Sequence, residues 1–288
     1  MNPVVNFSAY FELLKPRIAV LVLITTYSGM WLGHGGMPDP LLALFTLLGV
    51  GLAAGSSSIL NNLIDRFADQ KMTRTKDRSL ATGKVQPKVA LILGVSLGII
   101  SFIMLTATVN LMTASMALFS VLFYVFIYTL WLKRSSSLCT VVGGVAGALP
   151  PVMGFAAVDA LGLNAFVLFA ILFIWQPPHF WALAIVKKEE YRAAGFPMLP
   201  VVKGNRATQW QMLIYTIVLI PVTFAPYYLG TVGTAYLWVS IVMGCIYLGW
   251  TIVFMVMPFS EKSSYRLFYF SIFYLASLYI TLFIDYQS

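Results

Sequence analysis

The sequence predicts an all-α protein that crosses a membrane about nine times as a single domain of residues 1–288. The chain is 60% hydrophobic and 10% charged, with a mean hydropathy of +0.86, whereas soluble domains carry about 25% charged residues. Apolar runs long enough to span a bilayer as helices recur along the chain. These runs are residues 18–34, 41–63, 89–108, 111–132, 138–157, 164–186, 209–229, 234–257 and 266–284. A soluble domain with a membrane anchor is therefore excluded.

The first run follows Lys15 and Arg17, as the apolar part of a signal peptide would. It extends past Trp31 without a small-x-small cleavage motif, so we expect it to remain as the first span. The second and sixth runs are long and end in polar residues, which brings polar side chains to the mouths of two membrane helices. Cys139 and Cys245 fall inside predicted spans and form no disulfide framework or metal-binding pattern.

The fifth run contains the small-residue segment GGVAGALPPVMG, from Gly143 to Gly154. Gly143 and Gly147 form a small-xxx-small pair, which lets two membrane helices approach closely. Pro150 and Pro151 are expected to break or kink the hydrogen-bond ladder of this helix. Packing and kinking explain these residues without a catalytic role.

The distribution of positive charge predicts the orientation of the chain. All 18 Lys and Arg residues fall in the N-terminal segment or in the connections after the second, fourth, sixth and eighth runs. By the positive-inside rule, the N-terminus and these connections face the cytoplasm, and the C-terminus faces the opposite side of the inner membrane. The net charge of +8 is then expected to meet anionic lipid headgroups or an anionic substrate rather than nucleic acid.

Asn61, Asp65 and Asp69 stand at the polar end of the second run, each four residues from the next. A step of four residues turns an α-helix by about 40°, so the three side chains fall within about 80° of one face and about 6 Å apart along it. Carboxylates stacked in this way repel each other unless a cation lies between them. Oxygen ligands of this kind suit Mg²⁺, which is usually held by one or two carboxylates together with the phosphates of a substrate.

Basic residues follow this motif within fifteen positions, at Lys71, Arg74, Lys76, Arg78 and Lys84. A solvated helix end would explain the acidic residues alone. Acidic ligands for a metal beside basic contacts for a phosphate favour a phosphate-binding site instead. The candidates to contact the phosphates are Lys71, Arg74, Arg78, Lys133 and Arg134.

Five segments together resemble the UbiA-type intramembrane prenyltransferases. They are KPRI at 15–18, NNLIDRFADQKMTRT at 61–75, YTLWLKR at 128–134, GGVAGALPPVMG at 143–154 and WQPPHFWALAIVKKEEY at 175–191. The Asn-xxx-Asp-xxx-Asp pattern is typical of the whole family, while WQPPHFW and the Gly/Pro-rich fifth run are similar to the branch that farnesylates protohaem IX. The resemblance implies nine helices around a central cavity, with an isoprenoid diphosphate bound through Mg²⁺ at the cytoplasmic end.

The resemblance also implies roles for individual residues. Asn61, Asp65 and Asp69 would hold Mg²⁺ against farnesyl diphosphate, and protohaem IX would be the second substrate. Many family members carry a second Asp-xxx-Asp motif after the sixth span, but this register falls on Lys187 and Tyr191 here. An ammonium can contact a phosphate oxygen directly, so we expect Lys187 to replace part of a second metal, with Tyr191 beside the substrate.

His179 lies in the sixth run directly after two prolines, and a polar side chain inside a membrane is a functional candidate. It could ligate the haem iron, act as a base or bind the diphosphate. Alternatively, its imidazole could satisfy carbonyl groups released by the double-Pro kink. His34 is expected to be interfacial, and most aromatic residues of the fourth run are expected to face lipid or other helices, although some could line a prenyl channel. The candidate catalytic residues are Asn61, Asp65, Asp69, His179 and Lys187.

Three functions are compatible with these observations. The first is farnesyl transfer to haem in the membrane lipid, with a terminal oxidase or a downstream haem-modifying enzyme as a partner. The second is prenylation of an aromatic quinone precursor on the same fold, which gives no reason for WQPPHFW. The third is a cation-coupled transporter, but transporter sites usually lie near the bilayer midplane, whereas Asp65 and Asp69 stand at the end of a span.

Overall fold

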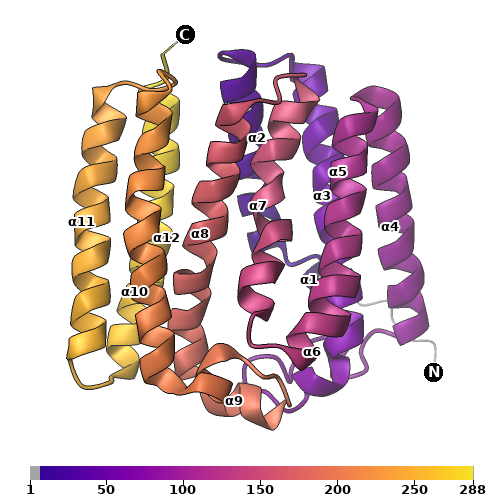
Figure 1. Cartoon of the computed structure of the whole chain (residues 1–288). Coiled ribbons are helices and arrows are strands. Elements are labelled where there is room, and N and C mark those ends of the chain that lie inside the picture. The colour runs from indigo at the N-terminus through magenta and orange to yellow at the C-terminus, as the bar shows by residue number, and fades with distance from the viewer. Residues whose placement is uncertain (1–6, 288) are drawn as a thin grey trace.

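The computed structural model describes residues 7–287, which form helices joined by loops (Figure 1). The helices are α1 (Phe7–Leu13), α2 (Pro16–His34), α3 (Pro40–Asp69), α4 (Pro87–Thr108), α5 (Leu111–Leu122), η1 (Phe123–Leu132), α6 (Lys133–Ser135), α7 (Cys139–Ala157), α8 (Leu163–Val186), α9 (Lys188–Ala193), α10 (Leu199–Tyr228), α11 (Thr234–Val256) and α12 (Glu261–Ile284). η1 is a π-helix that continues α5 without a break. Within these residues there is no β-strand, which confirms the all-α prediction.

The protein is an integral, multi-pass membrane protein. Eight elements in the described range are long and apolar enough to cross a bilayer: α3, α4, the continuous rod of α5, η1 and α6, and then α7, α8, α10, α11 and α12. α2, with 19 residues, runs alongside them in the bundle (Figure 1). Together they account for the nine predicted apolar runs.

Polar turns extend three helices beyond the predicted apolar runs. α3 continues to Asp69, while α10 and α12 begin at Leu199 and Glu261. Hydropathy marks the part of a helix that meets lipid, so it misses turns at or beyond the membrane interface. Within α10, Gly204 adopts a φ of 80° and a ψ of 170°, a conformation that favours glycine. The short helical segment at residues 199–203 is therefore set off from the membrane helix.

The long helices form two neighbouring groups in the bundle (Figure 1). α8, α10, α11 and α12 surround one hydrophobic core, which includes Trp181 and Tyr274. α3, α4 and α5 pack around a second core, which includes Val50 and Leu105. α7 packs against both α2 and α8 and so joins the groups. The short helices α6 and α9 lie at the end of the bundle opposite to the C-terminus (Figure 1), so the basic connections gather at one end.

α2 and α7 touch backbone to backbone. A Cβ atom added at Gly154 would lie 2.0 Å from the carbonyl oxygen of Thr26, and one added at Gly29 would lie 2.0 Å from the carbonyl oxygen of Pro151. Small residues permit this close approach between membrane helices, which gains dispersion energy that lipid cannot replace. The contact holds the first long helix against the middle of the bundle.

The glycine pair predicted to mediate helix packing meets side chains of the neighbouring helices rather than their backbone. A Cβ atom at Gly143 would lie 2.4 Å from the ring of Tyr128, and one at Gly147 would lie 2.4 Å from Oε1 of Gln176. These two glycines thus make room for side chains of η1 and α8, while Gly154 makes the backbone contact. α7 also continues as one helix through its two prolines rather than breaking there.

Replacing Gly154 with Ala is expected to destabilise the protein, because the added methyl group must push α2 and α7 apart. Overpacking of this kind costs about 1–3 kcal/mol. Gly249→Ala in α11 is the matched control, since a Cβ atom there has nothing within 4 Å. Thermal unfolding of the purified protein in detergent should show a lower Tm for Gly154→Ala alone. Equal Tm values for the two variants would contradict the backbone contact.

Candidate active site

The polar end of α3 is buried inside the protein rather than solvated. Asn61, Asp65 and Asp69 are 3%, 0% and 3% exposed. α3 is helical through Asp69, so the three side chains share one face, as the four-residue spacing predicts. A buried carboxylate without a partner costs several kcal/mol. Each of these groups must therefore be matched by hydrogen-bond donors from elsewhere in the chain.

Asp65 is bound by three side chains. The ammonium group of Lys133 donates to Oδ2 at 2.5 Å, and the guanidinium group of Arg134 donates to Oδ1 at 3.2 Å. The amide of Asn61 donates to Oδ2 at 3.0 Å. Lys133 and Arg134 form the start of α6, directly after η1. The fourth membrane rod thus delivers two positive charges to a fully buried carboxylate.

Asn61 and Asp69 each contact a cation from a different segment. Arg78, in the loop between α3 and α4, donates to Oδ2 of Asp69 at 2.8 Å. Lys15, directly before α2, donates to Oδ1 of Asn61 at 3.1 Å. The N-terminal segment, the α3–α4 loop and α6 therefore converge on the polar face of α3.

Lys15 is a site residue that was not predicted from the sequence. Its backbone is left-handed, with a φ of 50° and a ψ of 63°, which costs about 1–3 kcal/mol for a residue other than glycine. Burial, together with repulsion from Arg78 and Lys133, lowers the pKa of Lys15 from its ordinary value to about 7. Strain and a perturbed pKa together mark functional sites. The only sequence signal is the KPRI segment. A lysine directly before a span is also explained by the positive-inside rule, so this signal did not single out Lys15.

The π-helix η1 sets the register of the fourth rod. Oγ1 of Thr129 accepts a hydrogen bond from Asn61 at 3.2 Å and donates one to the carbonyl of Tyr124 at 2.8 Å. In an α-helix, Lys133 would lie on the face opposite to Tyr124. Nine residues at about 100° each turn the chain by about 900°, which is two and a half turns. A π-helix, bonded from i to i+5, turns by only about 80° per residue, so nine residues bring Lys133 back to the face of Tyr124. The π-helix therefore presents all three side chains to the site.

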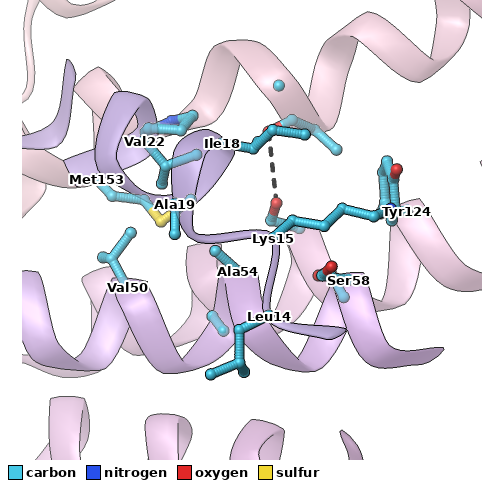
Figure 2. Close-up of a pocket in the computed structure, with 16 residues that line it drawn as sticks. Leu14, Lys15, Ile18, Ala19, Val22, Val50, Ala54, Ser58, Tyr124 and Met153 are labelled. Carbon is cyan, nitrogen blue, oxygen red and sulfur yellow. Dashed lines mark hydrogen bonds between the residues drawn. The ribbon is translucent and has the colours of Figure 1, made fainter. Parts of the chain in front are cut away.

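An apolar cavity of about 150 Å³ opens beside these residues, between α2, α3, η1 and α7. Lys15 and Tyr124 lie together at one end of it, and Val22, Val50 and Met153 lie at the other (Figure 2). Because Lys15 also binds Asn61, the ionic cluster stands at the head of the cavity. The arrangement suits a ligand with an anionic head and an apolar chain.

The aromatic residues of the fourth rod divide between lipid and the cavity. Phe119, Phe126 and Trp131 are 50%, 55% and 60% exposed on the surface of the bundle. Tyr124 instead lines the cavity. This division agrees with the expectation that most of these rings face lipid or neighbouring helices, while a prenyl channel stays a prediction.

The other predicted phosphate contacts lie outside the hydrogen-bonded cluster. Lys71 and Arg74 are exposed. The backbone nitrogen of Arg74 donates to Glu190 at 3.4 Å, and Lys187 donates to the same carboxylate at 2.9 Å, a hydrogen bond that raises the pKa of Lys187. Tyr191 packs against a neighbouring apolar cluster. Within residues 7–287, no hydrogen bond joins Lys187 or Tyr191 to the carboxylates of α3.

His179 also lies apart from the cluster, on the side of α8 that meets α12. Its Nδ1 is 2.7 Å from Oγ of Ser271, and its ring stacks between Trp175 and Phe268. The imidazole thus bonds to α12 rather than to a carbonyl group released by the prolines of its own helix. His34 is exposed at the other end of the bundle, where an interfacial residue is expected.

The donor set at the end of α3 fits Mg²⁺. Asp65, Asp69 and Asn61 offer hard oxygen ligands, and Mg²⁺ commonly takes one or two carboxylates and completes its shell with water and substrate phosphates. The described part of the chain holds no group of three or more His, Cys, Asp or Glu placed to bind a metal. A metal at α3 would therefore depend on oxygens of the bound ligand, which the surrounding Lys and Arg residues would also meet.

Comparison with known proteins agrees with this arrangement. The model of the UbiA prenyltransferase family matches residues 22–278. A protoheme IX farnesyltransferase from Gloeobacter violaceus is 48% identical over 277 residues, which cover 96% of this chain and 91% of the relative. A protoheme IX farnesyltransferase from Aquifex aeolicus is 45% identical over 278 residues, which cover 96% and 94%.

Solved structures share the fold at low sequence identity. A structure of digeranylgeranylglyceryl phosphate synthase has a TM-score of 0.82 at 15% identity, with 99% of each chain covered. A UbiA homologue from Archaeoglobus fulgidus, bound to GPP and Mg²⁺, has a TM-score of 0.65 at 15% identity, with 95% of this chain and 99% of that one covered. With the family model matched along most of its length and such similar relatives, the chain belongs to the UbiA prenyltransferase family.

Proposed function

We propose that this prenyltransferase moves the farnesyl group of farnesyl diphosphate onto a vinyl group of protohaem IX, with Mg²⁺ as its metal. Relatives that are 45% and 48% identical along nearly the whole chain are named protoheme IX farnesyltransferases. The observation that carries the proposal is the buried face of α3, where paired acidic and basic groups stand at the head of an apolar cavity. This polarity matches a diphosphate head joined to an isoprenoid chain.

The reaction begins when the C1–O bond of farnesyl diphosphate breaks and an allylic cation forms. Asp65, Asp69 and Asn61 would hold Mg²⁺, which would supply Lewis-acid stabilisation for the leaving diphosphate. Arg78 and Lys133 neutralise the same two carboxylates, so they are placed to bind the phosphates as well. The guanidinium group suits paired phosphate oxygens, whereas the ammonium group acts as a point charge.

The carbon chemistry takes place where the ionic cluster meets the apolar cavity. The cavity receives the farnesyl chain and excludes water from the cation, while Lys15 and Tyr124 position C1 at its mouth. A vinyl carbon of the haem attacks C1, which forms the new carbon–carbon bond and leaves a cation beside the porphyrin. Water captures this cation and its proton leaves with the diphosphate, so the product carries a hydroxyethylfarnesyl group.

The two other candidate functions are less well supported. Prenylation of a quinone precursor would use the same ionic cluster, but the most similar relatives given above are named for protohaem. A cation-coupled transporter would need an ion site near the midplane. The carboxylates here lie in the last two turns of α3 and are bound by Lys and Arg.

The orientation and the partners belong to the same proposal. The α3 cluster and the basic loops would face the cytoplasm across the inner membrane, with the C-terminus on the opposite side, as the positive-inside rule requires. Lys71, Arg74, Lys187 and Tyr191 would serve as outer contacts for the arriving diphosphate. The product is a modified haem that remains in the lipid. A terminal oxidase or a downstream haem-modifying enzyme is therefore the expected partner.

Asp65→Ala and Asp69→Ala are each expected to lower turnover more than about a hundredfold, because a metal ligand for the leaving group is lost. Asp65→Asn keeps the size of the side chain and should be nearly as inactive, which separates charge from packing. Asn61→Ala should be milder, and Asp77→Ala, an exposed carboxylate in the adjacent loop, is the control. Farnesylated haem formed by purified, monodisperse protein gives the rate. Near-normal turnover of Asp65→Ala would remove α3 from the metal site.

Arg78→Gln is expected to weaken binding of farnesyl diphosphate by about tenfold or more, since a hydrogen bond between charged groups contributes about 1.5–3 kcal/mol. Arg78→Lys should also be impaired because the fork geometry is lost. Arg74→Gln and Lys187→Gln should have smaller effects in the same direction. Calorimetry with each substrate is the measurement, and Lys262→Gln, at the start of α12, is the control. Equal losses of diphosphate and haem affinity in Arg78→Gln would indicate misfolding instead.

A further inference from the structure

The buried imidazole of His179 lies in a setting that prenyl transfer does not explain. The residue is 7% exposed and precedes the end of α8 at Val186 by seven residues, which is about 10 Å along the helix. Asp65 precedes the end of α3 at Asp69 by four residues, or about 6 Å. The imidazole and the carboxylate cluster therefore lie in the same half of the membrane, at the basic end of the bundle.

Two aromatic rings fix the plane of the imidazole. The centroid of the Trp175 ring is 4.3 Å from that of His179, with an interplanar angle of 17°. The centroid of the Phe268 ring is 4.5 Å away, with an angle of 22°. Because near-parallel rings cover both faces of the imidazole, only its edges can bind another group.

The hydrogen bonds of Ser271 select one tautomer of His179. Oγ of Ser271 donates to the carbonyl oxygen of Phe268 at 2.6 Å, and a carbonyl can only accept. The hydroxyl has one proton, so it must accept from Nδ1 of His179, which is 2.7 Å away. Nδ1 therefore carries the ring proton. Nε2, on the opposite edge of the ring, keeps its lone pair.

A third bond holds this pair of helices together. Nε1 of Trp175 donates to the backbone carbonyl of Ser271 at 2.8 Å. Trp175 and His179, one turn apart on α8, thus both bond to the same residue of α12. The imidazole cannot turn over without breaking its own bond to Ser271 and losing its stacking contacts.

This geometry is typical of a histidine that binds a metal. Such residues donate their other ring N–H to an acceptor, which fixes the tautomer and raises the basicity of the ligand nitrogen. A neutral imidazole in this form is a common ligand of haem iron. The chain has two histidines, and the other, His34, is the exposed last residue of α2.

We propose that Nε2 of His179 is an axial ligand of the iron of the protohaem substrate. The inference rests on the proposed function, because it requires haem as a substrate, and it adds the group that orients that substrate. Iron bound to His179 would hold the macrocycle against α8 and α12, while the diphosphate is held at α3. Ser271 acts through His179 and is a positioning residue.

The tautomer can be tested without haem. Nitrogen-15 NMR of protein labelled at histidine distinguishes a protonated Nδ1 from a protonated Nε2, and His34→Gln leaves the signals of His179 alone. The wild-type ring is expected to carry its proton on Nδ1. Ser271→Ala, which removes the acceptor, is expected to populate the other tautomer. A proton on Nε2 in the wild-type arrangement would overturn the inference.

Iron ligation is tested by titrating the purified protein with ferric haem. His179→Ala is expected to shift the Soret band of the complex and to weaken haem binding by about tenfold or more, since even a group that only supports a ligand contributes about 10–100-fold. Added imidazole should restore the band in part, and His34→Gln should match the wild type. Iron-free protoporphyrin should bind His179→Ala and the wild type equally, because it has no iron to ligate.

The outcomes separate the inference from the proposed function. If the wild type binds farnesyl diphosphate but neither haem nor protoporphyrin, the proposed function fails, and the inference fails with it. If haem gives the same spectrum and affinity with His179→Ala, or if His179→Ala loses protoporphyrin as well, the function stands and the ligand assignment is wrong. Should His179→Ala not fold, resonance Raman of ferrous Ser271→Ala decides. A lowered iron–histidine frequency supports ligation, and an unchanged one overturns it.

Discussion

Neutralisation of the buried acidic face of α3 is the constraint on which the rest of the structure depends. Two carboxylates in a low-dielectric interior are tolerated only if cations reach them with good geometry. Those cations come from distant segments, because Lys133 and Arg134 bind Asp65 from 68 and 69 positions away, and Arg78 closes the loop over Asp69. The π-helix before Lys133 and the left-handed backbone of Lys15 are local distortions, maintained because they bring charge to this face.

Much of the fold could be predicted from hydropathy, because membrane helices must bury their backbone polar groups within one segment. The π-helix could not be predicted. The sequence around Tyr124 is apolar and suits an α-helix as well as a π-helix, so tertiary contacts select between the two. Asn61, Asp65 and Asp69 were predictable, since their spacing alone places them on one face. Lys15 was not, because its role depends on a contact 46 residues away. Lys187 was predicted because it occupies the position of a second Asp-xxx-Asp motif, and that position does not specify a contact. In the fold, its ammonium group pairs with Glu190.

The structure separates two kinds of chemistry between the two halves of the bundle. Charged groups and the apolar cavity belong to α2, α3, η1 and α7, whereas the stacked imidazole belongs to α8 and α12. α7 lies between them, and its glycines let it touch both sides: Gly147 meets the amide of Gln176 on α8 while lining the cavity. A reaction that joins a diphosphate-activated chain to a large planar acceptor needs such an arrangement, because the two substrates must meet without sharing a binding surface.

The backbone contact between α2 and α7 also bears on how the protein is made. α2 enters the membrane before α7, so Gly29 finds its partner only when Pro151 has been synthesised and inserted. At 5–20 residues per second, that interval is on the order of ten seconds. During this time the glycine face of α2 meets lipid or the insertion machinery, and Lys15 has no rigid scaffold to hold it over α3. The candidate site is therefore completed after insertion, once the chain has crossed the membrane at least five times.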